Sequence, residues 1–504
     1  MIENFQHSLT FYLSKHFSVF CFFLILFSIS PTGYLSGNEE MYYGLANKFI
    51  NFNWNGEFSS FIASGDYRFI SDSLLGYMIF FLGFENTQII GSIVAGLLFT
   101  HALTLLFGEL DIANKMGILV VIIFLLLGQS LIGREWLFED FEAKIFAYYF
   151  VLLATRCFLI GNTIKLALFL SLATYFHLLV GFSWFALFLI SSLLFSRNYA
   201  GIFKSFLIYT VLSSPILIIA AYGFLGTNFE QDPGIPSPSY IYSYIRQYKM
   251  VLPFYSLSNF LINWLPGILV HIGLFVGILI LQRKDNEKLD NLYSLLSVSS
   301  LVLIVLLVIS FFDVEGVLAK FYPYRYTSLL LFFFILFYII NIHSSSTDQQ
   351  KNYADISIVI LLPFLLINLA TNAAYEYKEI YIKDDNKEKL YKYIEVNTKQ
   401  NEIVLIQPEL EEKFFDFERK LSRPTLITFK YIPSSKEGLT EWYKRREFKA
   451  QIFEKKTIDN PYPFSYMLYR NEDTHEYTEG QIIYKNPEYV LYEVSPKTSQ
   501  PNEY

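Results

Sequence analysis

The sequence predicts an all-α polytopic membrane domain followed by a small C-terminal α/β domain. Hydrophobic residues make up 53% of the 504 positions and aromatic residues 19%, and the mean hydropathy is +0.35. An ordinary soluble protein of this length carries less apolar surface, because that surface must be hidden from water. The apolar residues also form long runs with almost no charge, such as 117–132, 260–281 and 329–342. A run of about 20 apolar residues crosses a bilayer as a helix.

The length and position of the apolar runs predict about eleven membrane helices. We expect them at 12–31, 87–108, 115–133, 144–160, 163–177, 179–196, 202–224, 260–281, 292–312, 326–343 and 354–373. Basic residues gather in alternate connections, which the positive-inside rule assigns to the cytoplasm. This orientation leaves the loops 32–86, 134–143, 225–259 and 313–325 outside, together with the C-terminal region.

Two segments of these loops have a predicted structure of their own. Residues 69–84 are apolar but short and carry Asp72 early. A crossing there would turn the basic loops outwards, so we predict an interfacial helix that lies along the membrane. The loop 225–259 is rich in Pro, Ser and Tyr. It is either a flexible lid or an aromatic belt at the headgroups.

The composition changes near residue 374, where a separate C-terminal domain is expected to begin. The predicted domains are therefore 1–373, in the membrane, and 374–504, outside it. The second domain is expected to contain a charged helix, two strands, a second helix and a late hairpin, at 385–397, 402–406, 425–429, 435–448 and 481–494. Short β-rich runs between amphipathic helices are typical of a small α/β domain. Neither a Gly-rich dinucleotide fingerprint nor a P-loop is present, so nucleotide binding is unsupported.

Charge and cysteine usage exclude several classes of protein. The formal net charge is -7, and most charges lie in the loops and the tail, so nucleic acid is not an expected partner. Cys21 and Cys157 both fall in predicted spans. They are expected to act as small apolar side chains, and no disulfide or metal framework is visible.

An acidic pair, Glu39-Glu40, follows the first predicted span. Carboxylates at a membrane face are costly unless they are solvated or paired, so their position needs a reason. Helical spacing places Glu39, Tyr43 and Ala46 on one face, with Glu40 beside them. Such a carboxylate could act as general base for an acceptor hydroxyl. The alternative is a solvated helix start, where acids favour the helix dipole.

The second predicted outer loop carries charges of both signs between aromatic residues, in the run 133–144. Arg134 and Lys144 could clamp a phosphate, because arginine offers a bidentate fork and lysine a point charge. Glu142 could bind a sugar or orient Lys144. The alternative is a set of local ion pairs on a wet loop, each of which contributes little.

His177 and Arg325 are the other candidates for a binding site. His177 lies where two short spans meet at the outer face, and it could donate to a phosphate or bind a metal. It could equally be a satisfied hydrogen-bond donor. Arg325 follows Pro323 at the membrane edge and needs an anion, either a substrate phosphate or a lipid headgroup reached by snorkelling. The predicted topology puts both on the same side as Glu39 and Arg134.

Taken together, these residues resemble the GT-C superfamily of membrane glycosyltransferases. Many members carry an acidic pair followed by Tyr and Ala in the first outer loop, and Glu39-Glu40-Met41-Tyr42-Tyr43-Gly44-Leu45-Ala46 is similar, with Glu39 in place of the usual Asp. More narrowly, the chain is similar to a bacterial family of multi-pass proteins that has no established activity. The residues that carry this likeness are 141–144, 176–181, Pro323-Tyr324-Arg325, Arg419, Arg423 and 441–445.

The resemblance implies an inverting glycosyltransferase at the outer face of a bacterial inner membrane. The donor would be a polyprenyl-phosphate-linked sugar, the acceptor a lipid, glycan or protein hydroxyl, and the tail domain would bind the acceptor. Glu39, with Glu40 in support, would be the base. Arg134, Lys144, His177 and Arg325 would hold the lipid phosphate, and Glu142 would belong to the same substrate site.

Two other functions remain open from the sequence. One is a non-catalytic membrane scaffold or assembly factor on the same frame. The other is a lipid or polysaccharide transporter, although no inverted repeat and no broken helices with polar midplane residues are visible. The sequence implies no certain cofactor. No cluster has metal-ligand spacing, but Glu39, Glu40 and His177 could converge on a divalent ion.

Overall fold

The chain folds into two compact units, each built from separate stretches of sequence. The computed structural model describes residues 10–62, 68–196, 198–225, 234–281, 286–344, 348–381, 384–455, 462–473 and 480–494. The helical unit comprises Met1–Thr32, Gln88–Gly226 and Tyr242–Tyr375, and the mixed unit comprises Gly33–Thr87, Thr227–Ile241 and Glu376–Tyr504. Two segments that the sequence analysis treated as outer loops thus fold together with the C-terminal region.

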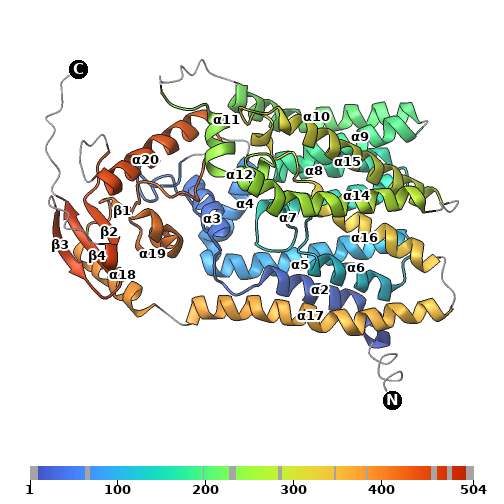
Figure 1. Ribbon diagram of the computed structural model, residues 1–504, viewed down its shortest axis with the longest axis horizontal. Coiled ribbons are helices and arrows are strands. Elements are labelled where there is room, and N and C mark those ends of the chain that lie inside the picture. The colour runs from blue at the N-terminus through green and yellow to red at the C-terminus, as the bar shows by residue number, and fades with distance from the viewer. Residues whose placement is uncertain are drawn as a thin grey trace. The chain divides into compact units, whose positions relative to one another are not determined.

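The helical unit is a bundle whose helices run alongside one another (Figure 1). Its longer helices are α2 (Phe17–Ile29), α5 (Phe84–Glu109), α6 (Asn114–Leu126), α7 (Ala143–Leu159), α8 (Thr163–Phe176), α9 (Leu178–Phe195), α10 (Tyr199–Leu225), α14 (Leu265–Ile280), α15 (Glu287–Phe311), α16 (Thr327–Ser344) and α17 (Asp348–Tyr381). Each corresponds to one of the predicted spans. The predicted span 115–133 is helical only to Leu126, because Gly128 and Gln129 adopt positive φ values of 71° and 64° and end the helix.

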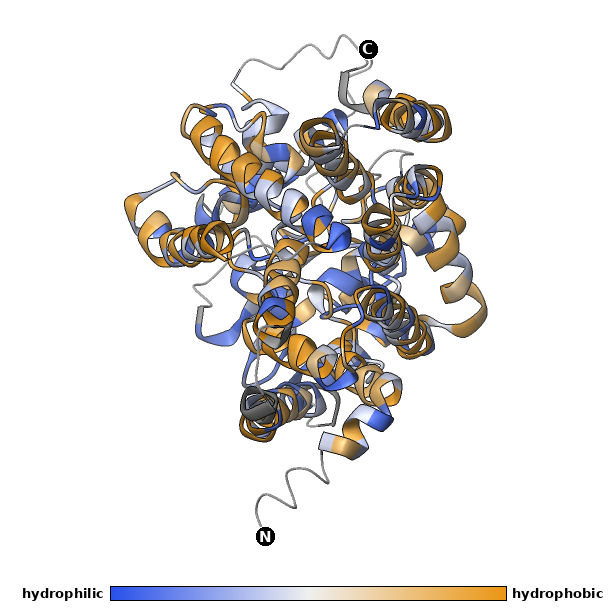
Figure 2. Cartoon of the chain, turned by 90° about the vertical axis from the view of Figure 1, so that its right-hand side faces the viewer, coloured by the Kyte–Doolittle hydropathy of each residue, from blue (hydrophilic) through white to orange (hydrophobic). Residues whose placement is uncertain are grey.

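Six helices among the described residues are long and apolar enough to cross a membrane, by length and composition. They are Phe84–Glu109, Leu178–Phe195, Tyr199–Tyr222, Leu257–Ile280, Glu287–Phe311 and Tyr353–Lys378. Figure 2, which looks along the bundle, shows its helices mainly in the hydrophobic colour. Large apolar side chains such as Leu269 and Ile280 stay exposed at 59% and 76%, which suits contact with lipid rather than water. The structure therefore confirms a multi-pass, all-α membrane domain.

The described part of the loop 225–259 is packed and not extended. Residues 226–233 lie outside the described residues, and the rest forms α11 (Pro238–Tyr240), a π-helical turn η2 (Ile241–Arg246), α12 (Tyr248–Val251) and α13 (Leu257–Asn259). In the helical unit, the Ser243 hydroxyl donates to the Gly316 carbonyl at 2.9 Å, and the Tyr244 hydroxyl donates to the Asp313 carbonyl at 3.1 Å. This stretch is thus folded against its neighbours, and the lid and the aromatic belt both stay predictions.

The mixed unit contains a four-stranded sheet with helices on both faces (Figure 1). The strands are β1 (Val404–Ile406), β2 (Tyr466–Arg470), β3 (Gly480–Lys485) and β4 (Tyr489–Val494), in the order β1-β2-β4-β3. β1 is parallel to β2, and β4 is antiparallel to β2 and β3. α18 (Asp385–Asn397), η5 (Pro408–Phe414) and α19 (Phe417–Leu421) pack on one face, and α20 (Lys436–Lys455) packs on the other.

The sheet has one apolar core on each face, and the side chains of β1, β2 and β4 point to the two cores in turn. In β1, Val404 and Ile406 face the core with α18, while Leu405 faces the core with α20. Successive side chains of a strand point to opposite faces, so a strand buried on both faces is apolar throughout. The small C-terminal α/β domain expected from the sequence is thus present.

Two details of the predicted tail are wrong. The expected strand at 425–429 is reduced to a single bridge between Thr425 and Val404, because the Thr425 N–H donates to Glu418 at 2.9 Å and the chain turns where Tyr431 N–H bonds the Thr428 carbonyl. The central strand β2 was not predicted. Its first four residues are all buried, so it lacks the alternation that marks a half-exposed strand.

The first loop of the mixed unit forms α3 (Gly37–Ile50) and α4 (Phe69–Leu82), which pack closely. A side chain at Gly76 would come within 2.5 Å of the Ala46 carbonyl oxygen, so only glycine allows this approach. α4 confirms the helix expected at 69–84. It leaves Leu74, Tyr77, Phe80 and Phe81 exposed at 40%, 54%, 69% and 76%, and its interfacial position stays a prediction.

Candidate functional site

The helical unit gathers charged side chains from three distant parts of the chain. Glu135 and Glu142 lie in the loop between α6 and α7, and Lys144 lies in the first turn of α7. His177 is the N-terminal cap of α9, and Arg325 lies in the turn before α16. These five residues are called the Glu135 cluster below.

Glu135 is the centre of this cluster. Its Oε1 lies 3.0 Å from Lys144 Nζ and its Oε2 lies 3.3 Å from Arg325 Nε. The side chains of Glu135, Lys144 and Arg325 are only 4%, 9% and 13% exposed. Lys144 Nζ also lies 3.0 Å from the centroid of the Trp136 ring, and an aromatic face attracts a cation. Two cations thus converge at a shielded point and share one carboxylate.

Within the cluster, Arg325 connects Glu135 to His177. A guanidinium nitrogen of Arg325 lies 2.6 Å from His177 Nε2. Arginine can only donate, so Nε2 must accept and the imidazole must be neutral, with its proton on Nδ1. The Val180 N–H also points at Nδ1, at 3.4 Å. A neutral imidazole accepts at only one nitrogen, so the shorter contact with Arg325 decides the tautomer. The Arg325 guanidinium also lies over the Tyr322 ring, 4.5 Å from its centroid.

Of the two acids in the cluster, Glu142 has the weaker contacts with hydrogen-bond donors and cations. It is 4% exposed, and its Oε2 lies 3.8 Å from Lys144 Nζ. Its Oε1 is buried and has no hydrogen-bond partner among the described residues. Burial raises the pKa of this carboxyl to about 7; Asp140 and Glu135 add to the rise, while Lys144 and Arg325 oppose it.

Arg134 is next to Glu135 in the sequence but has a different partner. Gly133 and Arg134 adopt positive φ values of 75° and 51°, so the chain turns sharply there. The exposed Arg134 guanidinium donates to Asn263 Oδ1. Among the described residues it forms no ion pair with Glu135 or Glu142. The predicted phosphate clamp of Arg134 and Lys144 stays a prediction.

The acidic pair lies in the mixed unit, at the start of α3. Ser36 caps this helix: its hydroxyl accepts from the Glu39 N–H at 3.2 Å, and Glu39 Oε2 accepts from the Ser36 N–H at 3.0 Å. This reciprocal capping box satisfies two backbone donors of the first turn. The acidic pair thus lies at the start of a helix, as the alternative interpretation expected. Glu39 is only 2% exposed, however, so it is not solvated there.

Glu40 is held by an arginine from the C-terminal region. Arg419 Nε lies 3.0 Å from both Glu40 oxygens, and a second guanidinium nitrogen lies 2.7 Å from Oε1. A third nitrogen reaches Glu85 Oε1 at 2.5 Å. Burial raises the pKa of the Glu40 carboxyl to about 7, and Arg419 opposes the rise. The forked geometry fixes both the position and the orientation of this carboxylate.

Two further acids beside Arg419 have structural partners. Asp416 binds Lys387 at 2.9 Å, Lys420 at 2.9 Å and the Tyr391 hydroxyl at 2.7 Å. Glu418 is 2% exposed. It accepts hydrogen bonds from the side chains or N–H groups of Asn55, Ser59, Ser60 and Thr425, at 2.6 to 3.0 Å. These bonds tie the first loop to the C-terminal region within the mixed unit.

The candidate residues therefore fall into two groups. Glu142, Lys144, His177 and Arg325 meet around Glu135 in the helical unit, whereas Glu39 and Glu40 belong to the mixed unit. Glu135 was not among the predicted site residues, although it lies in the same charged loop as Arg134. Arg419 was not among them either and was named only for the family likeness. The pairing of Glu135 with Arg325 and that of Arg419 with Glu40 join residues too distant in sequence for any spacing rule to find.

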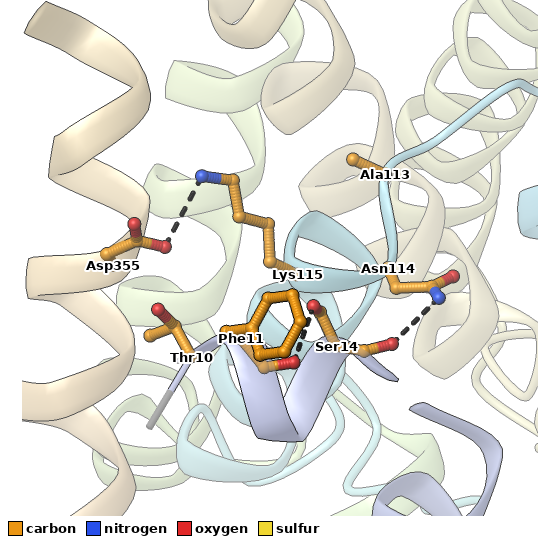
Figure 3. Close-up of a pocket in the computed structure, with 7 residues that line it drawn as sticks. All are labelled: Thr10, Phe11, Ser14, Ala113, Asn114, Lys115 and Asp355. Carbon is orange, nitrogen blue, oxygen red and sulfur yellow. Dashed lines mark hydrogen bonds and ion pairs between the residues drawn. The ribbon is translucent and has the colours of Figure 1, made fainter. Parts of the chain in front are cut away.

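A pocket of about 670 Å³ lies elsewhere in the helical unit, lined by Thr10, Phe11, Ser14, Ala113, Asn114, Lys115 and Asp355 (Figure 3). Its lysine faces an acid, since Lys115 Nζ lies 3.4 Å from Asp355 Oδ1. Asn114 donates to the Ser14 carbonyl at 2.8 Å. The positive charge in this pocket is already matched, which favours a structural role for the pair.

Metal binding stays a prediction. Within the described ranges no group of three or more His, Cys, Asp or Glu side chains is arranged to hold a metal ion. No step proposed below depends on one.

Comparison with known proteins finds likenesses among solved structures. No family model matches the chain, and no curated protein matches it. The crystal structure of ArnT from Cupriavidus metallidurans bound to undecaprenyl phosphate is similar, with 8% identity and a TM-score of 0.40, over 95% of this chain and 98% of that chain.

Proposed function

We propose that the protein is a GT-C-type membrane glycosyltransferase. It would move a sugar from a polyprenyl-phosphate-linked donor to the hydroxyl of a lipid, glycan or protein acceptor at the outer face of a bacterial inner membrane. The proposal rests on the residues that resemble this superfamily and on one observation: Lys144 and Arg325, 181 positions apart in the sequence, bind the two oxygens of the same buried carboxylate.

Lys144 and Arg325 share a single carboxylate, Glu135, so these three residues together carry one positive charge at a shielded point, which is suited to a phosphate. Arginine and lysine are the side chains that bind phosphate most often, the first through a fork and the second as a point charge. In the proposed reaction the acceptor oxygen attacks the anomeric carbon, and the bond from that carbon to the phosphate oxygen breaks. The phosphate then gains a negative charge. Lys144 and Arg325 would offset that charge, which is electrostatic stabilisation of the transition state.

A lipid carrier suits the surroundings of this cluster. The residues lie at the ends of α6, α7, α9 and α16 in a bundle of apolar helices. A polyprenyl chain is as apolar as those helices, so it can lie along them while its phosphate reaches the charged ends. A water-soluble sugar nucleotide would gain nothing from this environment.

The proposed base comes from the resemblance. Glu39, with Glu40 in support, would take the proton of the acceptor hydroxyl. Glutamine at position 39 can still accept from the Ser36 N–H and preserve the capping box, because Gln serves at this position as well as Glu. The Glu39→Gln variant therefore separates the charge of Glu39 from its part in helix capping.

The test is a transfer assay in membranes with a panel of labelled polyprenyl-phosphate hexoses and pentoses. We expect Lys144→Met and Arg325→Ala each to lower the rate by a factor of about 10² to 10³, and Glu39→Gln to lower it as severely. Lys204→Met is the matched control, since Lys204 is an exposed lysine of α10, and it should retain full activity. Undiminished transfer in both cluster variants, or no transfer by the wild type from any donor, would overturn the proposal.

A further inference from the structure

We infer that Glu142 carries a proton when a phosphate group occupies the Glu135 cluster, and that it gives this proton to the phosphate as the sugar leaves. The inference rests on the proposed function. It adds a proton-handling residue that the sequence assigned only to binding.

The first observation is the balance of charge around Glu142. Lys144 and Tyr148 face it from α7, Arg325 faces it from the turn before α16, and Asp140 and Glu135 face it from its own loop. Two cations therefore meet three carboxylates, if all are ionised. His177 adds no charge, because its contact with Arg325 requires a neutral ring. An anionic ligand would add a further negative charge to a cluster that already lacks cations.

The second observation is which of these acids is free to change its charge. Glu135 is bound through both oxygens to the two cations. Asp140 is 8% exposed and has a partner of its own. Glu142 keeps one buried oxygen with no hydrogen-bond partner among the described residues. A buried oxygen without a partner is costly for a charged group and much less so for a protonated one.

A bound phosphate would strengthen this preference. The pKa of Glu142 is already raised to about 7 by burial, with Asp140 and Glu135 adding to the effect. A phosphate beside Lys144 and Arg325 would raise the pKa of Glu142 further, as Asp140 does, since a nearby like charge disfavours the ionised form. The protonated carboxyl also gains a donor, which an anionic oxygen can accept.

The proton balances the chemistry of the proposed transfer. The donor is a phosphodiester with one negative charge, and the product is a phosphate monoester. As the bond from the anomeric carbon to the phosphate oxygen breaks, its electron pair stays on that oxygen. The Glu142 proton moves to the phosphate, so the monoester leaves with one negative charge and Glu142 is left ionised. The acceptor proton goes to the base, and Glu142 regains a proton from water.

The experiment is calorimetric titration of the full-length protein in detergent micelles with farnesyl methyl phosphate. This diester keeps a single charge over the working range, so any proton taken up must bind to the protein. Binding is measured at pH 7.5 to 8.5 in buffers that differ in ionisation enthalpy, which gives the number of protons taken up for each ligand bound. Glu142→Gln is the test variant, and Glu139→Gln, an exposed acid of the same loop, is the control.

We expect the wild type and Glu139→Gln to take up a large fraction of one proton and to bind up to about tenfold more weakly for each unit of rising pH. Glu142→Gln should bind with similar affinity at pH 7.5, take up no proton and lose the pH dependence. Equal proton uptake in Glu142→Gln, or binding by the wild type without uptake, would overturn this inference alone. Failure of every protein to bind the diester would overturn the phosphate site as well.

Discussion

Glu40 and Arg419 lie 379 positions apart in the sequence and form a forked ion pair, with Arg419 Nε 3.0 Å from both carboxylate oxygens. The two side chains are 3% and 11% exposed. The pair joins the first loop to the C-terminal region inside the mixed unit. Without Arg419, Glu40 has no ion-pair partner among the described residues, whereas Arg419 without Glu40 keeps only the exposed Glu85.

Arg419→Gln should therefore destabilise the mixed unit. Removal of the cation leaves a buried carboxylate without its counter-charge, at a cost of about 3 to 5 kcal/mol. The double variant Glu40→Gln/Arg419→Gln should recover part of this loss, because no unpaired charge remains. Denaturant unfolding followed by tryptophan fluorescence would measure the change, since Trp442 is fully buried in this unit. Glu85→Gln is the control: its side chain is 59% exposed, and its loss should change stability by less than about 1 kcal/mol.

Glu418→Gln should destabilise the same unit by a different route. The Glu418 carboxylate accepts only from hydroxyl and amide donors, among them Ser59 at 2.7 Å and the Thr425 N–H at 2.9 Å. A glutamine would turn its own NH₂ group towards some of these donors, at a cost of about 2 to 4 kcal/mol. The same unfolding measurement applies. The exposed Glu409→Gln should leave the midpoint where it was, and equal shifts in the two variants would contradict this account.

Asp416 predicts how the stability of the mixed unit depends on pH. Burial alone would raise the pKa of this carboxyl, but Lys387 and Lys420 outweigh burial and hold it below its usual value. The ionised form is thus favoured in the folded state. Its contribution is complete above the unfolded pKa of about 4 and is lost as the pH falls through the folded pKa.

The wild type should accordingly be more stable than Asp416→Asn at pH 7, by about 1 to 3 kcal/mol. The difference should shrink steadily as the pH falls below about 4. Unfolding midpoints of both proteins at pH 7, 5 and 3.5 would test this. A difference that stays constant over this range would show that Asp416 is not held ionised by its lysines.

The capping box of α3 predicts a contrast between two changes at its ends. Ser36→Ala removes the hydroxyl that accepts from the Glu39 N–H and should cost about 1 kcal/mol. Glu39→Gln should cost much less, because the amide oxygen still accepts from the Ser36 N–H. Unfolding midpoints would rank the two variants. If Glu39→Gln were as destabilising as Ser36→Ala, a loss of its activity could no longer be assigned to charge alone.

Much of the mixed unit could be predicted from local patterns. The helix α18 begins after Asp384, whose side chain accepts from two N–H groups of its first turn, and its amphipathic pattern is plain in the sequence. The hairpin β3–β4 also has local signals. The strand β2 has none, since Tyr466, Met467, Leu468 and Tyr469 are all buried between two cores, and periodicity cannot separate such a run from a buried helix.

The candidate site shows the same limit. The charged loop 133–144 and Arg325 attracted attention because charges near membrane helices need a reason. That Glu135 binds both Lys144 and Arg325 could not be read from spacing, because Arg325 arrives from a turn 190 positions later. Pairing at this distance depends on how the helices pack, which no local pattern encodes.

The way the mixed unit is assembled has a consequence for synthesis. The first-loop donors to Glu418, which are Asn55, Ser59 and Ser60, and the acid that pairs with Arg419 are made long before these partners exist. At about 5 to 20 residues per second, the 379 positions between Glu40 and Arg419 take roughly 20 to 75 seconds to translate. During that time Glu40 of α3 waits without Arg419, whereas Glu39 and Asp72 have their partners within the first loop. A nascent chain that stops before α19 would keep its apolar helices yet present an unfinished first loop, a state that quality-control proteases can recognise.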